Sequence, residues 1–125
     1  MKQSLKEQLA AQFGDRMVKV SFGGADVYVK RMNVAEFSDY YAKEQEIETQ
    51  EIEPVQKRLK LFALRVVDKD GNAVFDASDE ADLQQVAALP AMLFGLVETA
   101  FFRENYGIDL VQDTAKKADG SGENS

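Results

Sequence analysis

The sequence predicts an α+β fold that is predominantly helical, as a single domain with an N-terminal β-hairpin. Three observations lead to this prediction. Two short runs of alternating apolar and polar residues flank a pair of glycines, and apolar residues recur at helical spacing through most of the chain. A chain of 125 residues is also long enough for one core but short for two domains. We expect the folded domain to span residues 1–111.

A short amphipathic helix is expected first, over residues 2–13. Leu5, Leu9 and Phe13 recur at helical spacing among polar residues, and Gly14 supplies a natural end. This N-terminal stretch lacks the apolar segment of a secretory signal. We therefore expect the protein to stay in the cytoplasm of the cell that makes it.

A β-hairpin is expected around Gly23-Gly24. If these glycines form a two-residue primed turn, Val20 faces Val27 on the opposite strand. Val18 then faces Val29, so the apolar residues of both strands share one face. A two-stranded ribbon is marginal alone, and we expect this one to lie on helices.

A helix is expected to begin after Asn33, which forms a capping-box pattern with Glu36. Its expected apolar stripe consists of Val34, Phe37 and Tyr41. Acidic side chains crowd residues 44–53, where we expect thin packing and high mobility.

Pro54 is expected to start the next helix, because proline suits the first turn. The apolar residues that follow at helical spacing are Val55, Leu59, Phe62 and Val66. We expect them to form a continuous buried stripe.

The acidic segment at residues 68–72 is expected to turn the chain around Asp70-Gly71. It forms either a second short hairpin or a corner between a helix and a strand. Its carboxylates invite a calcium interpretation, but the glycine stands at the fourth position and Asp79 occupies the twelfth. An EF-hand loop needs glycine at the sixth position and glutamate at the twelfth, so an ordinary turn is favoured.

Two further helices are expected in the second half of the chain. Ser78 or Asp79 caps the first, which carries Leu83 and Val86. Pro90 opens the second, which runs to Tyr106 and ends at Gly107.

The last helix is apolar on every side over residues 90–97. One side faces the domain's own core, and the rest must be covered by something else. Either the other helices of the domain or an oligomer or partner surface would serve. The candidate residues for self-association or partner binding are Met92, Phe94, Phe102 and Tyr106.

Composition excludes most catalytic chemistry. The chain has no Cys and no His, which removes disulfides, zinc fingers, thiolate nucleophiles and Ser-His relays. Its formal charge of −7 disfavours nucleic-acid binding, and its uncharged residues 86–97 form a segment too short to span a bilayer. Pairs of acidic residues lie in hydrophilic stretches, where solvated surface is the simpler interpretation. We expect neither an enzyme nor a cofactor or metal site.

Residues 112–125 are expected to form a disordered tail. They contain no Val, Ile, Leu, Met or aromatic side chain, so burial cannot offset the entropy of ordering them.

The order of these segments resembles the tail assembly chaperones of long-tailed bacteriophages. The segments that carry the resemblance are RMNVAE at residues 31–36, LFALRVVDKDGNAVF at 61–75, LQQVAALP at 83–90 and ENYG at 104–107. Together they cover about residues 16–107.

The resemblance implies a self-associating protein of the host cytoplasm, absent from the mature virion. Such a chaperone coats the tape measure protein until tail-tube subunits polymerise around it. Many members of the family are also made as a longer −1 frameshift product that recruits tail-tube protein. Ala115, Lys116 and Lys117 can be encoded GCA AAA AAG, which contains a slippery heptamer. Without the resemblance, two lysines in a solvated tail are the simpler interpretation.

A second class of function stays open from the sequence. A small acidic cytoplasmic domain with one dedicated protein target would regulate or inhibit that target. A weaker third alternative is an acidic inhibitor that mimics nucleic acid.

Overall fold

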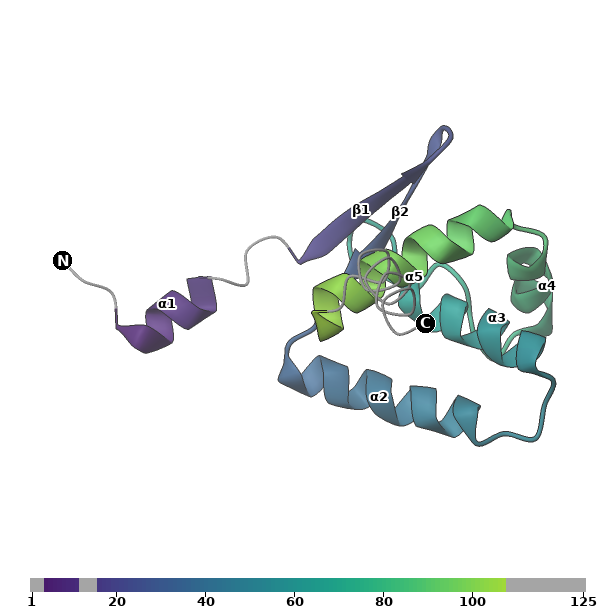
Figure 1. Cartoon of the computed structure of the whole chain (residues 1–125), viewed down its shortest axis with the longest axis horizontal. Helices are drawn as coiled ribbons and strands as arrows, with labels where there is room; N and C mark the ends of the chain where they lie inside the picture. Colours follow the sequence, from purple (N-terminus) through teal and green to yellow (C-terminus); the bar gives the residue numbers. More distant parts are fainter. Residues whose placement is uncertain (1–3, 12–15, 108–125) are drawn as a thin grey trace, which may run out of the picture.

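A computed structural model describes residues 4–11 and 16–107 of the chain. It confirms the α+β class, with a mostly helical fold and one antiparallel hairpin (Figure 1). The elements are α1 (Leu5–Ala11), β1 (Met17–Phe22), β2 (Ala25–Lys30), α2 (Val34–Glu48), α3 (Pro54–Arg65), α4 (Glu80–Ala87) and α5 (Ala91–Tyr106). The predicted tail over residues 112–125, including Ala115, Lys116 and Lys117, lies outside the described residues.

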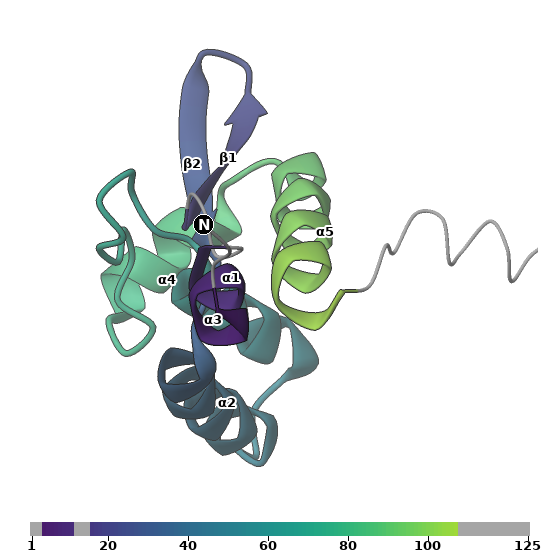
Figure 2. The ribbon, with the colours of Figure 1, turned by 90° about the vertical axis from the view of Figure 1, so that its left-hand side faces the viewer.

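The hairpin has the register that its turn predicts. Val20 pairs with Val27 and Val18 pairs with Val29, and Gly23 adopts the positive φ of 62° that its turn needs. Val20 and Val29 are buried on the side of the ribbon that rests on α5, because α5 contacts both strands. The ribbon is therefore supported by a helix, as predicted, and its tip projects beyond the helices (Figures 1 and 2).

The turn after α3 is neither of the two predicted alternatives in full, because only isolated bridges form there. Val67 forms single antiparallel bridges with Tyr28 of β2 and with Ala73, so the segment closes a short loop without forming a second pair of strands. The Asp68 carboxylate accepts hydrogen bonds from the backbone amides of Asp70 and Asn72, at 2.8 and 3.0 Å. These two hydrogen bonds from the backbone stabilise the turn.

The capping box at the start of α2 is confirmed, but the apolar stripe predicted for this helix is not its buried face. Asn33 accepts from the Glu36 amide while the Glu36 carboxylate accepts from the Asn33 amide. Val34 is 88% exposed. Tyr41 is also exposed, and of the predicted stripe Phe37 alone packs against the core. The buried positions of this helix are Tyr40, Glu44 and Ile47.

α2 turns Tyr40 and Glu44 toward the core because both accept hydrogen bonds from Arg65, a buried residue of α3. This also corrects the expectation of thin packing at the start of the acidic stretch 44–53, since Glu44 and Ile47 are buried.

Pro54 is the first residue of α3, as predicted. Leu59, Phe62 and Val66 are buried, but Val55 at the start of the stripe is 57% exposed. Val55 stands on the first turn of α3, beyond the reach of the core, and it lines a groove described below. α3 is the central helix, since it contacts α2, α4 and α5.

The last two helices begin and end where the sequence predicts. Asp79 caps α4, whose buried residues are Leu83 and Val86. Pro90 precedes α5 as its N-cap, and Gly107 ends it in the left-handed conformation with φ of 69°. Within the described residues, no single helix is long and apolar enough to cross a bilayer, and α4 and α5 meet that test of length and composition only as a pair bent by 104°.

Candidate interaction groove

A buried ionic cluster joins α2, α3 and α5. Arg65 donates from Nε to the Tyr40 hydroxyl at 2.8 Å and from Nη2 to Glu44 Oε1 at 3.0 Å. The Tyr40 hydroxyl donates to the same Glu44 oxygen at 3.0 Å. On the α5 side, the guanidinium carbon lies 5.1 and 4.8 Å from the ring centroids of Phe101 and Phe102. These contacts fix which side of each of the three helices faces the other two.

Burial governs the titration of this cluster. Burial raises the pKa of Tyr40 well above its usual value, so its hydroxyl stays protonated and available as a donor. Burial alone would lower the pKa of Arg65, but its contacts with Tyr40 and Glu44 outweigh that effect and raise it. Arg65 is therefore a permanent buried cation, and it has a second carboxylate, Glu98 Oε2, 3.7 Å from Nη1.

An open apolar groove of about 440 Å³ lies between α3 and α5, next to this cluster. Its apolar lining includes Val55, Leu59, Phe62, Leu89 and Phe94. Arg58 and Glu98 supply charges to it, from α3 and α5 respectively. Gly95 also lines it, and a Cβ added there would meet nothing within 4 Å, so the α5 side is open. Such a shape suits an apolar side chain or a helix with an apolar stripe.

The four predicted interaction residues of α5 do not form one surface. Phe94 lines the groove, where its ring stacks on Phe62 with centroids 4.3 Å apart. Met92 is 68% exposed and is not part of the groove lining. Phe102 and Tyr106 lie near the C-terminal end of α5, with ring centroids 5.1 Å apart. The Tyr106 ring also meets Phe37 of α2 edge-on at 5.2 Å.

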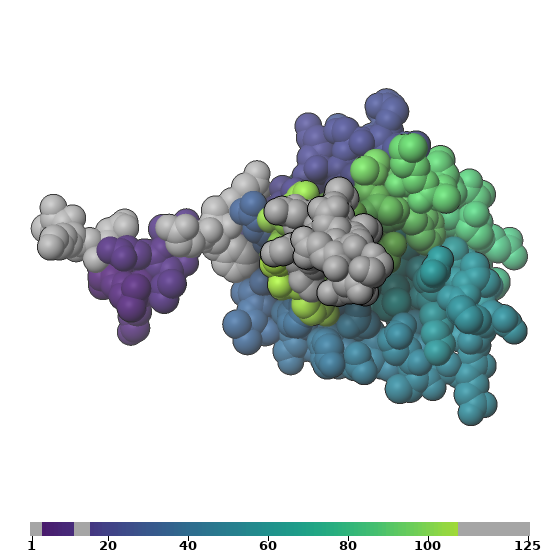
Figure 3. Space-filling model, viewed as in Figure 1, coloured from purple at the N-terminus to yellow at the C-terminus, as the bar shows by residue number. Residues whose placement is uncertain are grey.

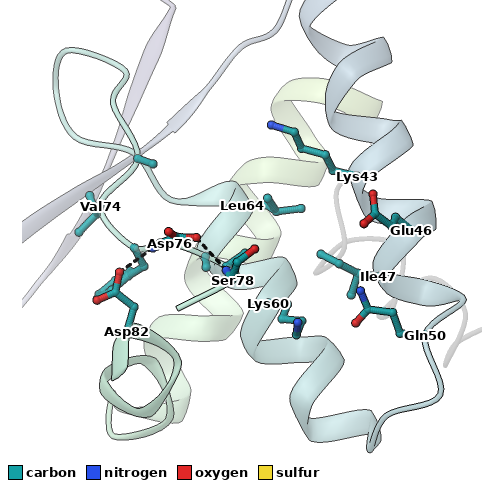
Figure 4. Close-up of a pocket in the computed structure, with 14 residues that line it drawn as sticks. Lys43, Glu46, Ile47, Gln50, Lys60, Leu64, Val74, Asp76, Ser78 and Asp82 are labelled. Atoms are coloured by element: carbon teal, nitrogen blue, oxygen red, sulfur yellow. Dashed lines mark hydrogen bonds between the residues drawn. The ribbon is translucent and has the colours of Figure 1, made fainter. Parts of the chain in front are cut away.

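A second hollow, of about 690 Å³, lies between α2, α3 and residues 73–78 (Figure 4). Lys43 and Glu46 of α2, with Gln50 just after it, stand on one side of the hollow. Asp76, Ser78 and Asp82 stand on the other. The two aspartates bind backbone amides: Asp76 accepts from the Ser78 amide, and Asp82 accepts from the Asp76 amide. They hold the loop in place, and the hollow is more polar than the α3–α5 groove.

Ion pairs tie the base of the hairpin to the helices. The Glu36 carboxylate pairs with Arg16 and Lys30, and these partners lower its pKa from 4.5 to about 2. Glu104 of α5 accepts from Arg31 Nε at 2.7 Å. Burial acts to raise the pKa of Glu104, but Arg31 and Arg103 outweigh it and lower the value. These contacts stabilise the fold and leave the groove free.

Glu44 and Arg65 are the residues that sequence reasoning missed. A signal was present, because Arg65 interrupts the apolar run at residues 61–67. In the described part of the chain, no group of three or more acidic residues is placed to hold a metal ion.

Comparison with protein families, with curated proteins and with solved structures gave no match to this chain. The argument for function therefore rests on the groove and on the residues that surround it.

Proposed function

We propose that the protein is a tail assembly chaperone of a long-tailed phage, which holds the tape measure protein soluble in the host cytoplasm. The observation that carries this proposal is the open apolar groove between α3 and α5 on a chain of charge −7. A long helical client with an apolar stripe needs grooves of this kind, and a strongly charged carrier keeps the complex soluble.

The residues that line the groove are typical of a helix-binding site. Phe62 and Phe94 stack against each other, and Val55 stands exposed on the first turn of α3. Aromatic rings and aliphatic side chains anchor an amphipathic helix, while Arg58 and Glu98 give polar contacts at the edges. The client inserts apolar side chains spaced at i, i+3 and i+4.

Recruitment of tail-tube protein belongs to the longer product in this proposal. Slippage by −1 at Ala115, Lys116 and Lys117 appends a further segment to a minority of chains. Reading the codons tests this step: an AAG codon at Lys116, or a stop soon after in the −1 frame, rules the site out.

Co-expression with a tape measure protein tests the chaperone role. We expect the client to stay soluble with the wild-type chain and to precipitate with the Val55→Asp variant, which places a charge in the groove. The matched control is Val34→Asp, because Val34 is an equally apolar but more exposed side chain on another helix.

Equal solubility of the client with Val55→Asp and with wild type would contradict the groove assignment. Failure of the wild-type chain to retain any long helical client, with capture of one compact protein in its place, would favour the regulatory alternative.

A further inference from the structure

The α3–α5 groove has a carboxylate in its wall that makes no hydrogen bond to any described residue. Glu98 of α5 lines the groove, and its side chain is 49% exposed. In the part of the chain that the structure describes, it pairs with Arg65 alone, whose Nη1 lies 3.7 Å away. That distance is too long for a hydrogen bond, so the oxygens of Glu98 keep their acceptor sites open.

The charge of Arg65 is already balanced by another carboxylate. Glu44 accepts from Arg65 Nη2 at 3.0 Å, and both of these side chains are buried. One cation thus faces two carboxylates, which leaves this end of the groove with an excess negative charge. Glu98 can therefore accept hydrogen bonds from a bound cation while Arg65 keeps its closer partner.

The opposite end of the groove carries a positive charge. Arg58 lines the groove and is exposed, and it precedes Arg65 on α3 by about 10 Å along the helix axis. The stacked rings of Phe62 and Phe94 lie in the apolar part of the lining. A bound segment would therefore place its apolar side chains on these rings and a cation at the Glu98 end.

Gly95 leaves room for a second helix to approach this wall of the groove. It lies one turn before Glu98 on α5, it is exposed, and a Cβ added to it would meet nothing within 4 Å. Its φ is not positive, so the helix itself does not need glycine at this position. Glycine inside a helix is less stable than alanine. The packing of the chain gives no reason for Gly95, whereas a helix in the groove would pack on the backbone exposed there.

The net charge of the whole chain favours a cationic partner. A formal charge of −7 attracts a basic segment and repels an acidic one, and added salt weakens both effects. From Val55 to Arg65, α3 rises about 15 Å, which matches about three turns of a bound helix.

We propose that the groove binds a cationic amphipathic helix of another protein, which packs apolar side chains on Phe62 and Phe94 and pairs a lysine or arginine with Glu98. An arginine would contact both oxygens of Glu98. This requirement rests on the proposed function for its site, and it states which segments of a long helical client the groove takes. Apolar packing alone would impose no such choice of charge.

Synthetic peptides test the charge requirement. Each is an alanine-rich helix of about 18 residues, long enough to be partly helical in water. It carries two leucines one turn apart and a test position one turn further, toward either end, occupied by Lys, Gln or Glu. In low salt, we expect the Lys peptide to bind the full chain about tenfold more tightly than the Gln peptide, and the Glu peptide to bind most weakly. Fluorescence anisotropy of labelled peptides measures the three affinities. Equal affinities, or a preference for Glu, would overturn the proposal.

The Glu98→Gln variant assigns the preference to one residue. In this variant the Lys and Gln peptides should bind equally well. The matched control is Glu48→Gln, which removes the same charge from an exposed position of α2 outside the groove lining. Glu48→Gln should keep the difference between the peptides. A Lys preference that survives Glu98→Gln, or that both variants reduce equally, would show that net charge alone is responsible and would overturn the pairing.

The Gly95→Leu variant tests the approach of the helix. The added side chain should fill the groove from α5 and weaken the binding of every peptide about tenfold. Ala35→Leu adds the same side chain to an exposed position of α2 and should leave binding unchanged. Far-UV circular dichroism and the thermal midpoint should not fall in either variant, because the added Cβ at Gly95 meets no neighbour. Undiminished binding to a folded Gly95→Leu chain would place the helix elsewhere and overturn the proposal.

A tape measure client separates this requirement from the proposed function. If Val55→Asp precipitates the client but the peptides show no charge preference, the chaperone role stands and the cation requirement fails. If the peptides show the expected preference but the client ignores Val55→Asp, the groove takes a cationic helix of another protein and the chaperone assignment fails. If no peptide binds at about 100 µM, the cation requirement fails whatever the client does.

Discussion

Arg65 of α3 holds the packing of α2, α3 and α5 together. It is buried with Glu44, and both charges are satisfied by hydrogen bonds, by Tyr40 and by the faces of Phe101 and Phe102. A buried pair of this kind contributes little net stability compared with apolar residues of the same shape, but breaking it leaves one charge stranded.

We expect Arg65→Met to lower the free energy of unfolding by about 3 kcal/mol, because it strands the Glu44 carboxylate in the core. Urea denaturation at neutral pH measures this loss. The double variant Arg65→Met/Glu44→Met should recover much of the stability, since no charge is left unpaired. A single variant that loses less than about 1 kcal/mol would show that water reaches Glu44.

Glu36 makes the free energy of unfolding depend on pH in the acidic range. Its pKa is about 2 in the folded protein against 4.5 in the unfolded chain, because Arg16 and Lys30 favour the ionised carboxylate. A lowered pKa contributes stability that is fully present above pH 4.5 and is lost as the pH falls through about 2.

Glu36→Gln keeps the capping box but removes the charge, so we expect a loss of about 1 kcal/mol at pH 7, allowing for the partial exposure of the pair. The difference from wild type should shrink steadily as the pH falls from about 4.5 toward 2. Urea titrations between pH 2 and 7 measure it, with Glu48→Gln on the same helix as control. A difference that is constant with pH would assign the effect to packing.

Elements differ in how far the sequence determines them. The hairpin register follows from two glycines and the alternation of their neighbours, which are local facts. The helix caps at Asn33, Asp79 and Gly107 are equally local. The side of α2 that faces the core is not determined locally, because it depends on a hydrogen bond between Arg65 and Tyr40, 25 residues apart. Apolar periodicity alone favoured Phe37 and Tyr41 and missed the polar pair that α2 buries.

The same reason explains the partial success for the candidate site. Sequence reasoning found that α5 carries surplus apolar surface, and Phe94 does line the groove. It could not find that α3 supplies the opposite wall, because Val55 was assigned to the core by its spacing. A groove between two helices depends on which turn of each helix extends beyond the core.

Phe94 and Met92 of α5 should respond differently to truncation. We expect Phe94→Ala to lower the free energy of unfolding by about 2 kcal/mol, because its half-buried ring stacks on Phe62. Met92→Ala should change it by less than about 0.5 kcal/mol, since this side chain is mostly exposed. Chemical denaturation of both variants measures the contrast. Equal effects would mean that the face carrying Met92 is also covered.

At the scale of the whole molecule, α2, α4 and α5 pack around α3, with the hairpin along the edge that α5 provides (Figure 3). The core joins residues from both strands and from α2 to α5.

We expect deletion of residues 112–125 to leave the thermal midpoint unchanged, because they have no apolar side chain to bury. Differential scanning calorimetry of the full and shortened chains makes the comparison. A decrease of about 5 °C or more, equivalent to roughly 1 kcal/mol for a domain of this size, would show that the tail packs against the domain.

The projecting tip of the hairpin makes the protein easy to label. Gly23 and Gly24 have no heavy atom within 4 Å of an added Cβ, and Gly24 does not need a positive φ. Gly24→Cys would thus accept a fluorophore without strain or crowding, and the chain has no other thiol to compete. One dye at this position would report the rotational tumbling of the protein in real time, so that any change in the size of the particle can be followed in solution.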